Sequence, residues 1–381
     1  MSDPRLDPSG LPLRPDLRGR TAYGAPQLDV PVRLNTNENA HPLPPGVAAA
    51  VVDALARVAG DLNRYPDREL TALREALAAW LTRSSGSPVD ADGVWAANGS
   101  NEVLQHVLQA FGGPGRTALG FTPSYSMHPV IAATTGTRWI DGVRPGSDVD
   151  PFDLTADAAA AQARDLDPDV VFLCSPNNPT GTALPLDVVT AVHDAAPHAV
   201  VVVDEAYAEF ARPGTPSALT LLPGRVRLVV TRTMSKAFAF AGVRLGYLAA
   251  DPAVTAALRL VRLPYHLSTL TQVAAVAALE HADDLLGTVA ALKAQRDRIV
   301  DGTRALGLEP VPSDANFVLV GGFADPAAAF DALLADGVLV RDVGLPGHLR
   351  VTAGTEAETD RLLAALERHV GAGRPAGRVS R

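Results

Sequence analysis

The sequence predicts an α/β protein in which a mostly parallel β-sheet is flanked by helices and a smaller α+β domain follows. Short apolar, β-branched runs at residues 170–173, 200–203 and 226–230 are the main observation. Each run ends abruptly in polar residues, and the intervals between runs leave room for about one βαβ crossover each. Such runs are typical of parallel strands buried on both faces. Ligands bind such sheets at the carboxyl ends of the strands.

The elements before these strands alternate in the same way. Apolar residues recur at helical spacing in residues 45–58, 70–81 and 102–111, and we expect a helix at each. Residues 94–97 form a short predicted strand ahead of the third helix, and a loop containing RYPD separates the first two helices.

The chain becomes strongly helical after Arg262, with helices expected at residues 271–281 and 284–306. A short α+β segment follows. It combines strands in ANFVLV, VLVRD and HLRVTAGT with helices at residues 327–335 and 356–369.

These patterns predict how the chain is divided. Residues 1–34, rich in Pro, Gly and Arg, form an N-terminal arm, and residues 35–60 contribute to the small domain. Residues 61–275 form the large domain, residues 276–370 the small C-terminal domain, and residues 371–381 a disordered tail.

The composition describes a globular protein with an acidic balance. Of 381 residues, 47% are hydrophobic and 20% charged, and the formal net charge is −9. An acidic chain argues against a general nucleic-acid surface. No run approaches the roughly 20 apolar residues that span a bilayer, and MSDPRLDPSG lacks the apolar core of a signal peptide. The single cysteine, Cys174, excludes an internal disulfide and favours a reducing cytoplasm.

Lysine is rare in this sequence. Only Lys236 and Lys293 occur among 33 basic residues. Arginine cannot replace a lysine whose amine must lose its proton and form an imine. Lys293 lies in a polar helical run and is expected on a solvated face. Lys236 follows an apolar strand directly, where a leftover surface lysine is the competing explanation.

Polar groups follow the first two of four strand ends. Gly99, Ser100 and Asn101 lie between a strand and a helix N-terminus, where unpaired N–H groups and the helix dipole favour a phosphate. An ordinary N-cap explains the same residues equally well. In SPNNPTG, turn geometry accounts for the prolines and glycine but does not require Asn177 and Asn178.

The third strand end carries a carboxylate. Asp204 follows four valines, so it lies at the end of a buried strand and needs a partner. A cationic pyridinium nitrogen is one such partner, and a helix N-cap or a buried salt bridge is the alternative. Tyr207 lies about one turn later and can reach the same ligand.

The fourth strand end is TRTMSKAFAFAGVRLGY. Thr233, Ser235 and Arg244 supply two hydroxyls and a guanidinium that suit a phosphate, and the Lys236 amine is nearby. A lysine that forms a Schiff base and an aspartate that pairs with a ring nitrogen are what pyridoxal phosphate requires.

The motifs SPNNPTG, VVVDEAY, TMSKAF and RLGY together resemble those of fold-type I aminotransferases. YGAPQLDVPVRLNTNEN, RYPD, AANGSNE, GFTPSYSMH and RVTAGT are similar, in order and spacing, to histidinol-phosphate aminotransferases of actinobacterial type. The resemblance covers about residues 11–370. It implies a large domain that binds pyridoxal 5'-phosphate. The implied reaction converts histidinol phosphate and 2-oxoglutarate to imidazole acetol phosphate and glutamate in histidine biosynthesis.

The resemblance also implies catalytic roles. Lys236 carries the cofactor and is both nucleophile and general base, and Asp204 pairs with the pyridine nitrogen. Tyr207 and Asn178 bond the phenolic oxygen of the cofactor. Tyr125 stacks on its ring.

Further implied roles concern the phosphate and the substrate. The phosphate would be held by Ser100, Asn101, Thr233, Ser235 and Arg244. Tyr65 would reach the phosphate of the neighbouring subunit, which implies a homodimer with shared sites. The implied substrate-binding residues are Tyr23, Asn37, Asn178, Arg341 and Arg350.

One departure from the family pattern lies beside the lysine. Ala239 and Phe240 stand where many relatives have a glycine and a small residue, and we expect them to reshape the pocket wall. The nine histidines show no metal-binding spacing such as HExxH, so we expect no metal and assign the histidines to structural or surface positions.

Other functions fit parts of this sequence. An aromatic amino-acid aminotransferase, or a decarboxylase of a phosphorylated amino acid, would share every cofactor residue. A nucleotide-binding dehydrogenase is disfavoured because no GxGxxG opens a βαβ unit. A regulator with an aminotransferase-like domain would need a DNA-binding module that the short, Pro-rich arm does not supply.

Overall fold

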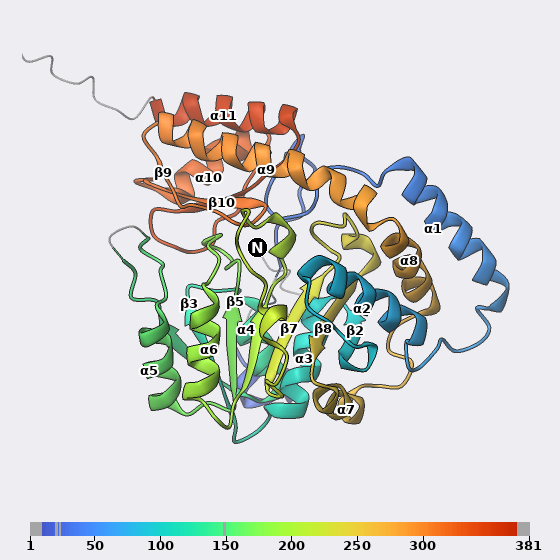
Figure 1. Cartoon of the computed structure of the whole chain (residues 1–381). Coiled ribbons are helices and arrows are strands. Elements are labelled where there is room, and N and C mark those ends of the chain that lie inside the picture. The colour runs from blue at the N-terminus through green and yellow to red at the C-terminus, as the bar shows by residue number, and fades with distance from the viewer. Residues whose placement is uncertain (1–9, 20–21, 23, 148–149, 372–381) are drawn as a thin grey trace, which may run out of the picture.

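The structure, a computed structural model, describes residues 10–19, 22, 24–147 and 150–371 (Figure 1). Within these residues the large sheet has the strand order β2-β8-β7-β6-β5-β3-β4. The strands are β2 Val94–Asn98, β3 Thr117–Thr122, β4 Arg138–Val143, β5 Val170–Cys174, β6 Val200–Asp204, β7 Leu228–Thr233 and β8 Leu245–Ala250. Every neighbouring pair is parallel except those of β8, which is antiparallel to β2 and β7. The predicted mostly parallel α/β architecture is confirmed.

One strand differs from its predicted position. The strand expected at residues 226–230 begins two residues later, because Val226 lies in a turn and is 52% exposed. It also continues through polar residues that were expected to end it. Arg232 remains in the buried part of β7 because its guanidinium forms an ion pair with the Glu205 carboxylate. Buried ion pairing therefore extends a strand beyond its apolar run.

Helices cover both faces of this sheet. They are α2 Thr71–Ser85, α3 Ser100–Phe111, α4 Met127–Thr135, α5 Ala156–Leu166, α6 Leu186–Ala195, α7 Pro252–Val261 and α8 Thr269–Glu280. α1 Pro45–Val58 packs on α8, and α9 Ala282–Ala305 runs from the end of α8 onto the smaller unit. In the described part of the chain, none of the helices combines the length and apolar character that crossing a membrane requires.

Alternating residues of β6 face different cores. Val201 and Val203 pack in a first core with side chains of α2 and α8. Val200 and Val202 pack in a second core with side chains of α3, α4 and α7. A strand that is buried on both faces explains why the sequence shows continuous valine rather than apolar–polar alternation.

A third core holds the smaller α+β unit, at the top of Figure 1. Its antiparallel sheet has the order β12-β10-β9, with β9 Glu309–Pro310, β10 Phe317–Gly321 and β12 Leu349–Thr352. A second pairing joins β1 Val32–Arg33 to β11 Val338–Leu339, and α10 Pro326–Ala335 and α11 Glu356–Gly371 complete the unit. Val32 and Leu34, from the predicted arm, pack in this core. The domain boundaries stay a prediction.

Candidate functional site

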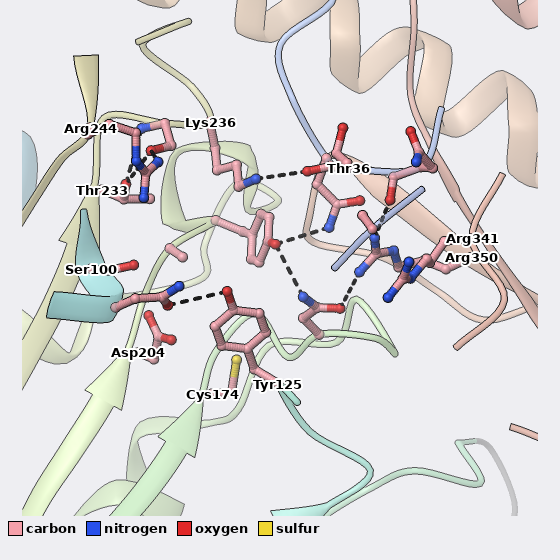
Figure 2. Close-up of a pocket in the computed structure, with 18 residues that line it drawn as sticks. Thr36, Ser100, Tyr125, Cys174, Asp204, Thr233, Lys236, Arg244, Arg341 and Arg350 are labelled. Carbon is pink, nitrogen blue, oxygen red and sulfur yellow. Dashed lines mark hydrogen bonds between the residues drawn. The ribbon is translucent and has the colours of Figure 1, made fainter. Parts of the chain in front are cut away.

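A pocket of about 230 Å³ lies where the carboxyl ends of β5, β6 and β7 meet the smaller unit (Figure 2). It gathers side chains that are far apart in the sequence. The polar residues that line it are Asn35, Thr36, Asn37, Ser100, Asn101, Tyr125, Cys174, Asn178, Asp204, Tyr207, Thr233, Ser235, Lys236, Arg244, Arg341 and Arg350. Most of the residues singled out from the sequence therefore lie in one pocket, because the ends of parallel strands meet at one edge of a sheet.

Lys236 lies just beyond β7 and points into this pocket. Its Nζ donates a hydrogen bond of 2.9 Å to the main-chain oxygen of Thr36. Burial, and then the nearby Arg350 guanidinium, lower the pKa of Lys236 to about 8. An amine with this pKa is partly neutral near physiological pH, as a nucleophile or general base must be.

Asp204, the last residue of β6, is only 2% exposed. Its carboxylate accepts a hydrogen bond of 3.1 Å from Thr231 Oγ1. His128 Nε2 lies 3.1 Å from the other carboxylate oxygen. The His128 ring also stacks on Phe172, with 4.7 Å between the ring centroids. Both oxygens of this buried carboxylate therefore have a polar neighbour inside the protein.

Sequence reasoning missed the contact between His128 and Asp204. His128 was grouped with the structural and surface histidines because the histidines show no metal-binding spacing, and its partner Asp204 lies 76 residues away in the sequence. The one available signal was its position in the motif GFTPSYSMH, three residues after Tyr125 and at the start of α4. That spacing puts both rings near the same pocket, and the rings make an edge contact at 5.3 Å.

The Tyr207 hydroxyl is buried and accepts two amide hydrogen bonds. Asn37 Nδ2 donates at 3.0 Å and Asn178 Nδ2 at 3.3 Å. Arg350 Nη1 in turn donates to Asn178 Oδ1 at 2.7 Å. Burial raises the pKa of Tyr207 to about 12, so the hydroxyl keeps its proton at neutral pH. Asn37, which was expected to contact the substrate, lines the pocket, and its side chain contacts this hydroxyl.

A set of hydroxyls and one guanidinium forms a polar cradle beside the N-terminus of α3. Thr233 Oγ1 donates to Ser235 Oγ at 3.0 Å, and Arg244 Nη1 donates to the same oxygen at 3.4 Å. Ser100 begins α3, where free N–H groups and the helix dipole attract anions. A Cβ atom on Gly99 would collide with the Arg244 guanidinium. The donor set suits a phosphate group.

Two arginines line the pocket from the smaller unit. Arg350 on β12 is 8% exposed, and its Nη2 donates to the Asn35 main-chain oxygen at 2.7 Å. Arg341 is bridged to Arg350 through main-chain hydrogen bonds. Figure 2 shows this pair on the opposite side of the pocket from Arg244, with Lys236 between them. The pocket can therefore hold an anion at each end.

Four other residues singled out from the sequence are not among the residues that line this pocket. Tyr65 is 79% exposed outside the pocket, where its ring stacks on Tyr265 at 4.4 Å. Tyr23 lies outside the described residues. Phe240 was expected on the pocket wall, but it is buried in the first core, where its side chain is surrounded by apolar residues. Ala239, its neighbour, has a left-handed backbone with a φ of 54° and is likewise not among the pocket residues described above.

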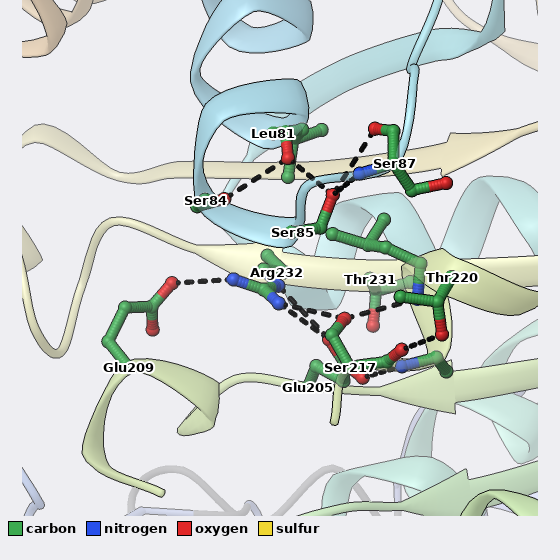
Figure 3. A network of polar contacts seen from close by, with 12 residues as sticks. Leu81, Ser84, Ser85, Ser87, Glu205, Glu209, Ser217, Thr220, Thr231 and Arg232 are labelled. Carbon is green, nitrogen blue, oxygen red and sulfur yellow. Dashed lines mark hydrogen bonds and ion pairs between the residues drawn. The ribbon is translucent and has the colours of Figure 1, made fainter. Parts of the chain in front are cut away.

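Behind the pocket lies a buried ion-pair network (Figure 3). Arg232 on β7 contacts Glu205 at 2.8 Å and Glu209 at 3.0 Å, and each of these side chains is at most 7% exposed. Ser217 Oγ donates to Glu205 at 2.7 Å. The network ties the segment after β6 to the end of β7, and these two ends carry Asp204 and Thr233.

The chain is similar to known proteins over nearly its whole length. The family described as aminotransferase class I and II matches residues 30–366. A histidinol-phosphate aminotransferase of Paenarthrobacter aurescens is 60% identical over 365 residues, which cover 95% of each chain. One of Thermobifida fusca is 62% identical over 348 residues, covering 91% of this chain and 92% of the relative.

Solved structures agree with the fold. A histidinol-phosphate aminotransferase from Sinorhizobium meliloti, crystallised in complex with pyridoxal-5'-phosphate, superposes with a TM-score of 0.77 at 27% identity. The match covers 90% of this chain and 92% of that one. The expected fold-type I architecture is thereby confirmed, and the chain belongs to the class I and II aminotransferase family.

Proposed function

We propose that this protein is a pyridoxal-phosphate-dependent histidinol-phosphate aminotransferase. It would convert histidinol phosphate and 2-oxoglutarate to imidazole acetol phosphate and glutamate. The observation that carries the proposal is one pocket with the Lys236 amine between an anion cradle and an arginine pair. The name carried by relatives at 60% and 62% identity supports it.

The pocket residues fit pyridoxal phosphate. Asp204 would pair with the ring nitrogen, Tyr207 and Asn178 would bond the phenolic oxygen, and Tyr125 would face the ring. The phosphate would be held by Ser100, Asn101, Thr233, Ser235 and Arg244. When bound, the protonated ring supplies an electron sink for the charge that develops when the substrate Cα loses its proton.

Lys236 would hold the cofactor covalently and also move the substrate proton. With a pKa of about 8, a useful fraction of its amine is neutral at physiological pH. The neutral Nζ takes the proton from the substrate Cα as general base. The Thr36 main-chain oxygen, 2.9 Å away, orients the amine by accepting one of its N–H bonds.

Asp204 would keep the ring nitrogen protonated. For this it must stay ionised although it is buried. Thr231 Oγ1 and His128 Nε2 serve as its hydrogen-bond donors, each at 3.1 Å. Both bonds satisfy an oxygen of the buried carboxylate and hold it in place.

Arg350 and Arg341 would bind the anionic end of each substrate. Histidinol phosphate presents a phosphate, and glutamate presents a carboxylate to the same guanidinium groups. Guanidinium pairs with either anion through parallel N–H bonds, so one pair of arginines can serve both half-reactions.

The proposed enzyme is a homodimer, in which Tyr65 reaches the cofactor phosphate held by the second copy. Tyr65 lines a surface groove together with Leu62, Tyr265 and Leu270, and each of these three is at least 41% exposed. Leu263, in the same loop as Tyr265, is 76% exposed. Exposed apolar residues gathered in this way mark a surface that another protein covers.

We place the enzyme in the cytoplasm, where the lone cysteine stays reduced.

The assembly has its own test. Sedimentation velocity of the purified protein should show a dimer, and Leu263→Glu should shift it toward monomer. Tyr65→Phe, which keeps the ring stack and loses the hydroxyl, should weaken cofactor binding in the dimer. A monomeric wild-type protein with full activity would exclude the shared site.

A single-turnover absorbance experiment tests the activity. Histidinol phosphate, glutamate and phenylalanine are added separately to the cofactor-loaded protein without a 2-oxo acid. Rapid loss of the visible band with the first two and slow loss with phenylalanine supports the proposal. The reverse pattern would identify an aromatic amino-acid aminotransferase. A protein that develops no visible band with added cofactor would refute the cofactor assignment itself.

A further inference from the structure

The direction of the Tyr207 hydroxyl proton depends on the orientation of two amide side chains. A phenol has one proton to give and two lone pairs to accept with. Asn178 and Asn37 each donate an N–H to this oxygen, at 3.3 and 3.0 Å. Both lone pairs are then occupied, so the hydroxyl proton is directed to a third group. Because Tyr207 lines the pocket, that group is one that occupies the pocket.

The orientation of Asn178 is set by an arginine. Arg350 Nη1 lies 2.7 Å from Asn178 Oδ1, and a guanidinium only donates. The amide oxygen of Asn178 therefore faces Arg350, and its NH₂ group faces Tyr207.

The orientation of Asn37 is set by a threonine hydroxyl. The Asn37 main-chain N–H donates to Thr352 Oγ1 at 3.1 Å. Thr352 Oγ1 then gives its own proton to Asn37 Oδ1 at 2.9 Å. This pairing turns the Asn37 NH₂ group toward Tyr207. A valine at position 352 would have the same shape and would leave the amide free to turn over.

Asn37 is held in an unusual backbone conformation. Its φ of 55° lies in the left-handed region, which asparagine tolerates better than most residues. Asn316 Nδ2 donates to the Asn37 main-chain oxygen at 3.1 Å. Asn37, Asn316 and Thr352 are each at most 3% exposed, so water does not compete for these bonds.

Thr352 also shares a strand with the substrate-binding arginine. Arg350 and Thr352 are two residues apart on β12, so their side chains project from the same face. One strand thus carries the group that orients Asn178 and the group that orients Asn37.

We propose that Thr352 is a positioning residue that, through Asn37, makes Tyr207 a hydrogen-bond donor to the phenolic oxygen of the bound cofactor. The inference rests on the proposed function, because it needs a cofactor with that oxygen in the pocket. A donated hydrogen bond stabilises the phenolic oxygen as an anion. It therefore opposes protonation of the cofactor group that gives the visible absorbance. Without Thr352 Oγ1, the Asn37 amide can turn over and accept the Tyr207 proton instead.

The test is a pH titration of the visible absorbance of the cofactor-loaded enzyme. Thr352→Val should raise the apparent pKa of the absorbance change by about one unit. A shift of that size corresponds to the free energy of one hydrogen bond to a charged group. Thr352→Ser keeps the hydroxyl and should titrate like the wild type. Tyr207→Phe removes the donor itself and should raise the apparent pKa at least as far as Thr352→Val.

The charged and titratable groups around Tyr207 are the same in all these variants. Arg350, Cys174 and Asp204 influence the phenol most directly. Lys236, Arg244 and Arg341 line the same pocket. Because none of these is altered, a shift reports on the hydroxyl orientation rather than on a lost charge.

The outcomes separate this inference from the proposed function. A shift in Tyr207→Phe without one in Thr352→Val overturns the positioning role and leaves the function standing. If Tyr207→Phe forms the visible band but does not shift it, the assignment of Tyr207 to the phenolic oxygen is wrong, and the inference falls with it. Should Thr352→Val fail to fold, Thr352→Ala removes the same hydroxyl and likewise leaves the Asn37 amide free to turn over. The same upward shift is then expected, and its absence overturns the inference.

Discussion

The Lys236 amine donates a 2.9 Å hydrogen bond to the main-chain oxygen of Thr36, a residue 200 positions earlier in the chain. This contact joins the loop after β7 to the segment after β1, and so closes the pocket over the sheet edge. Thr36 acts through its backbone, so its side-chain identity carries no signal for the contact.

Replacement of Lys236 should abolish catalysis. Lys236→Arg keeps a positive charge but cannot form an imine, so we expect no lysine-dependent visible band and a loss in kcat of at least roughly 10²–10⁴-fold, the contribution of a positioned general base. Absorbance spectroscopy and a coupled glutamate assay measure both effects. Lys293→Arg is the matched control, because that amine bonds the Ala211 main-chain oxygen away from the pocket. A band that survives in Lys236→Arg and disappears in Lys293→Arg would contradict the assignment.

The lowered pKa of Lys236 predicts how cofactor capture depends on pH. Only the neutral amine is nucleophilic, so the capture rate by cofactor-free protein should rise with pH and level off above about 8. Arg350→Gln removes a nearby positive charge that lowers this pKa, so the midpoint should move to higher pH. Stopped-flow absorbance across the pH range gives both midpoints. A wild-type midpoint at the ordinary lysine value would show that the amine is not buried as described.

His128 should contribute to cofactor binding through Asp204. His128→Phe keeps the stack on Phe172 and removes the hydrogen bond, so the dissociation constant of pyridoxal phosphate should rise roughly 10–100-fold, since a hydrogen bond to a charged group is worth about 1.5–3 kcal/mol. Equilibrium dialysis of the cofactor measures this. His106→Phe is the control, because His106 is also buried but accepts a bond from Trp95. Equal losses in both variants would mean that the effect is one of core packing.

The network around Arg232 should be important for stability. Arg232→Met leaves two buried glutamates without their cation, and loss of one partner of a buried pair costs about 3–5 kcal/mol in the free energy of unfolding. Urea denaturation measures this directly. Arg298→Met is the control, because it breaks an ion pair with Asp360 whose side chains are 41% and 57% exposed. That exposed pair should contribute at most about 1 kcal/mol. Equal losses in the two variants would contradict a special role for the buried network.

The polar motifs at the strand ends were predictable from the sequence. Asp204, Thr233 and Lys236 each follow an apolar run, and parallel strands bring such ends together whatever else the chain does. Helices with regular apolar spacing, such as α1, were also predictable from the local pattern. Local periodicity was sufficient because backbone geometry alone decides which side chains share a face.

The sequence by itself determined the sheet, the strand-end motifs and the chemistry of the lysine. Only the tertiary structure decided which partner each of these groups meets. His128 contacts Asp204, Asn37 contacts Tyr207, and Thr352 contacts Asn37 across 315 residues. Arg232 stays in a strand that its charge was expected to end, because Glu205 neutralises it. Such pairings depend on how distant segments pack around a shared pocket, and no local period or propensity along the chain encodes that packing.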